Sequence, residues 1–263
     1  MNISMLSKPL PNVPLEGLLY REPVSYDRAT QPAVNFEDFE IIEDENYEED
    51  PPLESDWHVA AMALLVGILR DFWEGRDDIY VSGNTVVRFD KTRKNRFRGP
   101  DLYIVKGVAD KEFRRSWNSW EENDLNPNFI LELASLSTAT FDVTAKKRIY
   151  ERELKTPEYM VYNPDTDKLQ GWRMKNNRYK AIKPNQDGRL FCEEIGLWLG
   201  LAKYPFFKDR KMVKIPRFFD NDGQLVLTRD ETETQLRRAA EAKAQRAEAE
   251  VARLKALLEN LKK

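Results

Sequence analysis

Residues 129–150 read FILELASLSTATFDVTAKKRIY and join an apolar strand to a basic helix. Phe129 to Leu133 form a short apolar run that breaks at small hydroxyl residues, and the later part has apolar residues at helical spacing. Glu132 interrupts the apolar run. A buried carboxylate is costly unless it is paired with a cation or bound to a metal. The stretch therefore predicts a buried strand that carries a charged site and leads directly into a helix over residues 139–154.

Composition limits the chemistry that the chain can perform. Of 263 residues, 41% are hydrophobic, which is enough for a folded core. The single cysteine, Cys192, excludes an intrachain disulfide framework and a cysteine-based zinc cluster. His58 is the only histidine, and no G-x-S-x-G serine motif accompanies it, so carboxylates and lysines are the expected catalytic groups. The chain shows no secretory signal and no long apolar run, which predicts a soluble protein of the cytoplasm.

Charge is distributed unevenly, although the net formal charge is only −3. The segment from Glu37 to Asp56 contains eleven acidic residues, whereas Lys91 to Arg98 and Lys146 to Arg152 are basic. Residues 1–52 lack a sustained period, which predicts a poorly ordered or surface-wrapping acidic arm. This arm is interpreted either as a solvated tether or as a segment that mimics or repels nucleic acid.

A helix and a hairpin are expected first. The stretch ESDWHVAAMALLVGILRDFW, residues 54–73, has apolar residues at three- and four-residue steps, with Ser55 or Asp56 as the cap, which predicts an amphipathic helix. Two short β-like runs, 79–81 and 85–89, are joined by Ser, Gly and Asn and are predicted to form a hairpin.

More strands are expected further along the chain. Asp101 opens a strand over 102–105, and residues 106–127 form a polar connection. Residues 158–182 read as three strands separated by an Asn-Pro turn and an Asn-Asn turn, and residues 188–202 add further β-structure. With the two helices, this pattern predicts an α/β fold built on a mixed sheet.

The C-terminal part has the composition of a long helix. From Arg229 to Lys263 the sequence is mainly Ala, Glu, Lys, Arg, Gln and Leu, without Gly or Pro. A heptad frame places Arg237, Ala244, Val251 and Leu258 at one seam position and Ala240, Ala247, Leu254 and Leu261 at the other. The helix is expected either to self-associate through residues 230–263 as a coiled coil or to stand alone in solvent. The predicted domains are residues 1–52, 53–228 and 229–263.

Three charged residues occupy positions that are unusual for their type, and their charges are of opposite sign. Asp101 opens a strand, Glu132 lies inside a strand, and Lys146 lies on the helix that follows. Two carboxylates on neighbouring strands can bind Mg²⁺ or Mn²⁺ and leave positions for water. Asp142, Lys146 and Tyr150 are spaced by four and project from one helix face. The combination predicts metal-assisted phosphodiester hydrolysis, with a lysine that orients the water or the phosphate.

Each of these residues also has an ordinary structural interpretation. Asp101 is typical of a turn former at a strand edge, and Lys146 of a solvated lysine. Asp142 fits a local helix pair, and Tyr150 fits the edge of a core. Glu132 is the hardest to explain in this way, although a buried ion pair with an arginine would satisfy it.

Four motifs, taken in order, carry a resemblance to a known family. They are GPDLYIV at 99–105, FILELASLST at 129–138, an Asp ahead of a K-x-x-x-Y run, and PEYMVYNP at 157–164. They resemble the Uma2 family (DUF820) of restriction-endonuclease-like proteins, a branch of the PD-(D/E)XK nuclease superfamily that is abundant in cyanobacteria. The resemblance covers residues 54–202 in outline. It implies a restriction-endonuclease-like domain over residues 53–228, with a mixed β-sheet flanked by helices.

The resemblance also implies catalytic roles. Asp101 and Glu132 match the metal-binding carboxylates, and Lys146 matches the catalytic lysine. The basic motif of the superfamily has that lysine at the position of Ala134, and in this family it has moved onto the helix. The implied cofactor is Mg²⁺ or Mn²⁺, and the implied partner is DNA.

Other matching positions have supporting roles. Ser135, Asp142 and Tyr150 match family positions, His58 matches a histidine often seen early in the family, and Glu54 is an additional acid near the metal. The alternative for His58 is capping or packing. The basic loop is expected to contact DNA phosphates, or else to be a charged loop in water. The expected contact residues are Arg93, Lys94, Arg96 and Arg98.

The leading hypothesis is a metal-dependent endonuclease that hydrolyses DNA. The alternative is a catalytically silent nucleic-acid-binding or protein-interaction module that keeps the nuclease fold and assembles through its C-terminal helix. A third hypothesis is a structural oligomer organised by residues 230–263.

Overall fold

The computed structural model describes residues 55–93, 95–109, 113–134, 142–205 and 212–261. The acidic arm predicted for residues 1–52 lies outside these ranges, as do Glu54, Lys94 and Ser135. Of Asp142, only the backbone is described. The predicted domain boundaries after residues 52 and 228 stay predictions.

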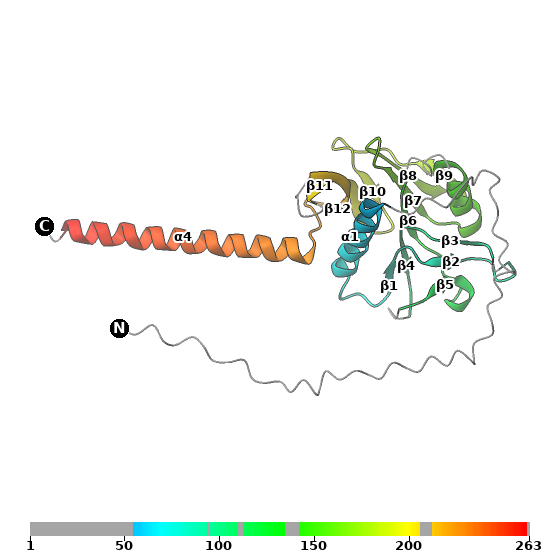
Figure 1. The fold of residues 1–263 in the computed structure, drawn as a ribbon, viewed down its shortest axis with the longest axis horizontal. Coiled ribbons are helices and arrows are strands. Elements are labelled where there is room, and N and C mark those ends of the chain that lie inside the picture. The colour runs from blue at the N-terminus through cyan, green and yellow to red at the C-terminus, as the bar shows by residue number, and fades with distance from the viewer. Residues whose placement is uncertain (1–54, 94, 110–112, 135–141, 206–211, 262–263) are drawn as a thin grey trace, which may run out of the picture. The chain divides into compact units, whose positions relative to one another are not determined.

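A six-stranded mixed sheet lies at the centre of the fold, in the order β1-β4-β6-β7-β8-β9 (Figure 1). β6 and β7 are parallel, and the other neighbours are antiparallel. The strands are β1 (Ile79–Ser82), β4 (Leu102–Lys106), β6 (Phe129–Leu133), β7 (Glu158–Asn163), β8 (Lys168–Lys175) and β9 (Arg178–Ala181). Asn176 and Asn177 turn the chain between β8 and β9 with φ of 52° and 58°, values that asparagine tolerates. The mixed α/β fold predicted from the sequence is confirmed.

The predicted hairpin over residues 79–89 is wrong. β1 pairs with β4, whereas β2 (Val86–Arg88) pairs with β3 (Phe97–Arg98) and with β5 (Ser116–Asn118) in a separate three-stranded sheet. Gly83 explains why the chain does not turn back on β1. A Cβ there would lie 2.1 Å from the carbonyl oxygen of Asp101, and the next amide, of Asn84, donates to the Pro100 carbonyl at 2.8 Å. The chain crosses the start of β4 and leaves the large sheet.

α1 (Asp56–Phe72) and the helix that follows β6 cover the sheet. The Ser55 hydroxyl caps α1 by accepting from the backbone N–H of His58 at 3.3 Å, as the sequence predicts. The helix predicted for residues 139–154 is described from residue 142 onward. It consists of η4 (Asp142–Lys146), α3 (Lys147–Ile149) and η5 (Tyr150–Leu154). The first and last of these are π-helical, and Lys155 ends the helix in a left-handed conformation with φ of 53°.

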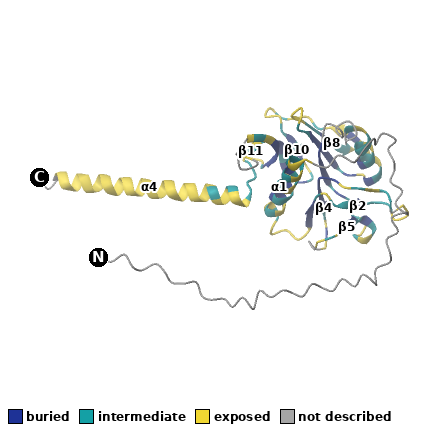
Figure 2. Ribbon diagram, in the orientation of Figure 1, coloured by how far each residue is buried: buried dark blue, intermediate teal, exposed yellow. Residues whose placement is uncertain are grey.

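Two apolar cores lie on opposite faces of the large sheet, and buried residues concentrate along its strands (Figure 2). On one face, Leu65 and Leu69 of α1 pack with Leu102 and Leu131, and with a second three-stranded sheet. That sheet comprises β10 (Leu190–Cys192), β11 (Leu197–Pro205) and β12 (Met212–Phe219). On the other face, Tyr103 and Ile130 pack with Tyr150. Side chains that alternate along β4 and β6 therefore face different cores.

α4 (Arg229–Leu261) begins in contact with the rest of the fold. Thr228 and Glu231 form a capping box, because the Glu231 N–H donates to the Thr228 hydroxyl and the Thr228 N–H donates to the Glu231 carboxylate. The same carboxylate accepts from the guanidinium of Arg217, which is fully buried, at 2.7 Å. Arg229 pairs with Asp71 of α1 at 2.7 Å.

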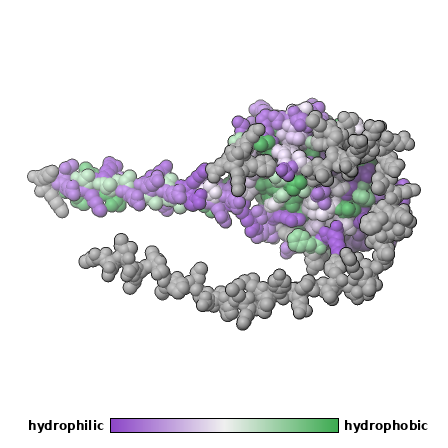
Figure 3. Space-filling view, viewed as in Figure 1, coloured by the Kyte–Doolittle hydropathy of each residue, from purple (hydrophilic) through white to green (hydrophobic). Residues whose placement is uncertain are grey.

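The remainder of α4 is exposed, and green apolar residues recur among purple polar ones along its C-terminal half (Figure 3). Across the described ranges, no helix has the length and apolar content needed to cross a membrane.

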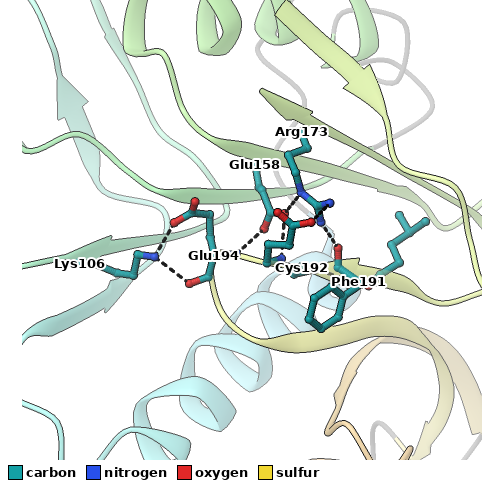
Figure 4. A network of polar contacts seen from close by, with 8 residues as sticks. Lys106, Glu158, Arg173, Phe191, Cys192 and Glu194 are labelled. Carbon is teal, nitrogen blue, oxygen red and sulfur yellow. Dashed lines mark hydrogen bonds and ion pairs between the residues drawn. The ribbon is translucent and has the colours of Figure 1, made fainter. Parts of the chain in front are cut away.

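A buried ion pair joins the large sheet to the β10–β11 sheet (Figure 4). Glu158 is fully buried at the start of β7, and Arg173, its register partner on β8, donates to it at 2.7 Å. The backbone N–H groups of Glu193 and Glu194 donate to the same carboxylate at 2.9 and 3.0 Å. Arg173 also donates to the carbonyl oxygen of Phe191 at 2.6 Å. Every oxygen of this buried carboxylate is therefore satisfied.

Candidate active site

Asp101 and Glu132 lie opposite each other on neighbouring strands. Leu102 of β4 pairs with Leu131 of β6, so extending this antiparallel register by one residue brings Asp101 opposite Glu132. The Asp101 carboxylate contacts His58 of α1, and the Glu132 carboxylate contacts Tyr150 of the helix after β6. Both residues are buried, with exposures of 6% and 1%. The convergence of the two acids on one metal ion stays a prediction.

The Asp101 carboxylate is fixed by a backbone amide and a histidine. The Leu133 N–H donates to its Oδ2 at 2.7 Å, and Nε2 of His58 lies 2.9 Å from its Oδ1. An ionised carboxylate can only accept, so His58 carries the proton on Nε2 when Asp101 is charged. His58 therefore does more than pack or cap a helix, because it orients an acid of the candidate site.

The Glu132 carboxylate is held by the helix that follows its own strand. The hydroxyl of Tyr150 donates to Oε1 at 2.7 Å, and the ammonium of Lys146 donates to Oε2 at 3.3 Å. Lys146 and Tyr150 therefore lie on the same side of this helix, as their four-residue spacing predicts. The π-helical turns that carry both residues are unusual, and such turns are frequent at functional sites.

The protonation of Tyr150 follows from its surroundings. Burial, followed by the negative charge of Glu132, raises the pKa of Tyr150 well above its usual value. The phenol stays protonated and acts as a donor to Glu132. It thereby stabilises the carboxylate in an interior where an unpaired charge would be costly.

The described arginines of the basic loop differ in their contacts. Arg93 is exposed and pairs with Asp90 at 2.7 Å, and Arg96 pairs with Glu153 at 2.5 Å. Arg98 is partly buried, and its Nε is buried without a hydrogen-bond partner in the described residues. Burial lowers the pKa of Arg98, and the negative charges of Glu153 and Glu132 oppose that shift. Of the three described arginines, only Arg98 combines proximity to the acids with an unsatisfied donor.

Ala134 occupies the position where the basic superfamily motif has its lysine, and it is packed in the core. Ala134 directly follows β6, is 1% exposed, and donates its N–H to the Tyr162 carbonyl at 2.8 Å. A lysine side chain at this position would enter the core that contains Tyr150. The ammonium that contacts Glu132 belongs to Lys146 of the helix.

Asp101 and Glu132 are the candidate ligands for a divalent cation. In the ranges that the structure describes, no three His, Cys, Asp or Glu side chains are grouped to hold a metal ion. Carboxylates such as those of Asp101 and Glu132 are the ligands that Mg²⁺ and Mn²⁺ prefer, with water and substrate completing the coordination. A carboxylate has four lone-pair sites, so the hydrogen bonds described above and a cation can share the group.

Sequence reasoning did not identify what fixes Asp101. Its partners are a backbone amide 32 residues away and a histidine 43 residues away, neither of which has a local sequence pattern. Two signals pointed to His58: it is the sole histidine of the chain, and it matches a histidine often seen early in the family that the sequence resembles.

Comparisons with known proteins place the chain in a family. The Uma2 family model, described as "Putative restriction endonuclease", matches residues 31–202. Among solved structures, the chain is similar to the crystal structure of a putative nuclease belonging to DUF820 from Anabaena variabilis. The identity is 12% and the TM-score 0.43, over 56% of this chain and 78% of that one. A comparison with curated proteins found no match. The family match spans well over half of the 263 residues, and the chain therefore belongs to the Uma2 family.

Proposed function

We propose that this protein is a metal-dependent endonuclease that hydrolyses phosphodiester bonds in DNA. The observation that carries the proposal is the arrangement around Glu132. This buried carboxylate lies opposite Asp101 and is held by Lys146 and Tyr150. Burying two carboxylates is costly for stability alone, and buried charged groups of this kind are common at catalytic sites.

Asp101 and Glu132 would hold Mg²⁺ or Mn²⁺. When bound, such an ion lowers the pKa of a coordinated water and offsets charge on the phosphate. His58 and the Leu133 amide fix Asp101, and Tyr150 fixes Glu132, so the two carboxylates are oriented before the cation binds. Pre-orientation of this kind reduces the reorganisation that binding would otherwise require.

Lys146 is proposed as the catalytic cation. Its side chain is 22% exposed, so its ammonium reaches both Glu132 and solvent. From there it can orient the attacking water or bind a phosphate oxygen. Arg98 is proposed as the main phosphate contact, because it is partly exposed and forms no ion pair within the described residues. Arg93 and Arg96 would have to give up ion pairs to do the same. A cytoplasmic location belongs to the proposal and is consistent with the single, buried cysteine.

The test is cleavage of supercoiled plasmid DNA by the full-length protein with Mg²⁺ or Mn²⁺, with and without EDTA. Wild type is expected to cut only with metal, and the double variant D101A/E132A is expected to be inactive. The matched control is Asp167→Ala, which removes an exposed carboxylate that pairs with Lys214. Cleavage that persists in the double variant would remove the assignment.

A second candidate is a silent DNA-binding module, and one observation favours it. Each of the four oxygens of Asp101 and Glu132 has a protein partner within 3.3 Å, so the acids are satisfied without an ion. Calorimetric titration of Mn²⁺ into wild type and Glu132→Ala separates the two candidates. DNA binding without cleavage, and without a Mn²⁺ binding event that depends on Glu132, would favour the silent module.

A further inference from the structure

The exposed part of α4 carries a stripe of large apolar residues. Leu236 is 66% exposed, Val251 51%, Leu254 49%, Leu257 50% and Leu258 57%. Every described side chain from Gln235 to Asn260 is exposed. Most helical stability in proteins comes from packing an apolar face against something else. A 33-residue helix with this stripe therefore lacks a partner for it within the described part of the chain.

The stripe follows a heptad repeat. Val251 and Leu258 fall on one seam position and Leu254 and Leu261 on the other, with Ala244 and Ala247 preceding them. A β-branched residue at the first seam position with leucine at the second favours two-stranded coiled coils. Small alanine side chains earlier in the seam allow two helix backbones to approach each other.

The charges beside the seam indicate which partner fits. In a parallel, in-register pair, a residue at the g position faces the e position of the next heptad on the other helix. Lys243 then meets Glu248 of a second copy, and Glu250 meets Lys255 of a second copy. Both contacts join opposite charges, and each occurs twice in a symmetric pair. A second copy of this chain is therefore electrostatically complementary to α4.

The distribution of apolar residues indicates the direction. The seam changes from Arg237 and Ala240 at its start to Leu258 and Leu261 at its end. A parallel pair places leucine against leucine and alanine against alanine. A fully overlapping antiparallel pair would instead place the leucines against Arg237 and Ala240 and bury less apolar area.

We infer that α4 pairs with α4 of a second copy in a parallel, in-register coiled coil, so that the protein is a homodimer. Both globular domains then attach at the same end of the coiled coil. Insofar as the proposed nuclease activity holds, each particle carries two acid pairs related by a two-fold axis. The dimer itself does not depend on that activity, and its tests measure mass and cross-linking rather than cleavage.

The first test is light scattering coupled to size exclusion on the full-length chain. Wild type is expected at the mass of two chains, and L254K/L258K at the mass of one. The matched control, A249K/A256K, adds the same charges on the outward face of the helix and is expected to remain a dimer. A monomeric wild type at tens of micromolar overturns the inference, and so does a dimeric L254K/L258K.

The second test reverses the charges. Lys243→Glu makes both copies of one contact repulsive and is expected to weaken the dimer on the order of tenfold. K243E/E248K restores opposite charges and is expected to restore most of the affinity. A double variant weaker than the single variant would overturn the proposed register.

The third test reports direction. Ala244→Cys places a thiol on the seam, and Ala249→Cys places one on the outward face, while the native Cys192 is buried. Oxidised glutathione is expected to link A244C to its copy as a covalent dimer and to leave A249C largely unlinked. A dimeric A244C that does not cross-link would overturn the parallel arrangement, even if the mass were that of two chains.

Discussion

The hydroxyl of Tyr150 donates a 2.7 Å hydrogen bond to Oε1 of Glu132, and the two side chains are 0% and 1% exposed. Tyr150→Phe removes this donor and keeps the ring. Because Oε1 then loses a partner in the interior, we expect a loss of about 1–3 kcal/mol in the free energy of unfolding and reduced cleavage. Urea unfolding and plasmid nicking measure the two effects. An unchanged stability would show that water replaces the phenol.

Lys146→Met is expected to abolish cleavage while DNA binding is retained. The change keeps an apolar stem and removes the ammonium that contacts Glu132. Lys146→Arg is the matched variant, because it keeps the charge with a different donor geometry and should keep part of the activity. Cleavage at the wild-type rate in the methionine variant would remove Lys146 from the mechanism. Fluorescence anisotropy with labelled duplex DNA measures binding.

His58→Ala removes the ring that contacts Asp101. A partner that orients a metal ligand typically contributes tenfold or more to metal affinity or activity. We expect the dissociation constant for Mn²⁺ to rise about tenfold. Calorimetric titration measures it. His58→Gln, which can still donate to Asp101, should lose less, and equal losses in both variants would assign His58 a purely packing role.

Glu158→Ala removes the fully buried carboxylate that pairs with Arg173 and leaves this guanidinium only the exposed carboxylate of Glu193. Breaking a buried pair from one side typically destabilises by about 3–5 kcal/mol. We therefore expect a large fall in the urea midpoint with no direct effect on the acid pair of the candidate site. Lys214→Met, which breaks the exposed pair with Asp167, is the control and should change the midpoint little. Similar shifts in the two variants would contradict the buried role of Glu158.

The contact between Glu231 and Arg217 should weaken in acid. Burial by itself raises the pKa of Glu231, but hydrogen bonds from Arg217 and Thr228 hold it below its usual value. A carboxyl with a lowered folded-state pKa contributes stability that is present above its unfolded pKa and lost as pH falls through the folded one. Wild type should therefore exceed Glu231→Gln in melting temperature near pH 6, and the difference should shrink below about pH 4. A difference that is constant down to pH 2.5 would contradict this assignment.

Local patterns predicted those parts of the fold that depend on neighbouring residues. The cap at Ser55, the strand containing Glu132 and the Asn176–Asn177 turn all follow from residues close in sequence. The hairpin prediction failed because strand pairing is a long-range property. Turn residues 82–84 indicated a change of direction, but the close approach of Gly83 to Asp101 decides where the chain goes.

Within the site, Lys146 and Tyr150 could be assigned to one helix face because their spacing survives the change from α- to π-helical turns. The π-helical turns themselves have no sequence pattern that distinguishes them. The buried charges of Arg217 and Glu158 were also missed. Both occur in strands, as Glu132 does, and the same cost of burying a charge could have singled them out.

The pairing of Arg217 with Glu231 determines where a shortened version of this protein should stop. The composition changes at Arg229, which suggests a stop codon after Thr228. In such a fragment, the fully buried guanidinium of Arg217 would lack its carboxylate counter-ion, Glu231. A fragment that ends after Thr234 keeps this counter-ion and omits the apolar stripe, so it is the better choice for crystallisation and for assays of the monomer.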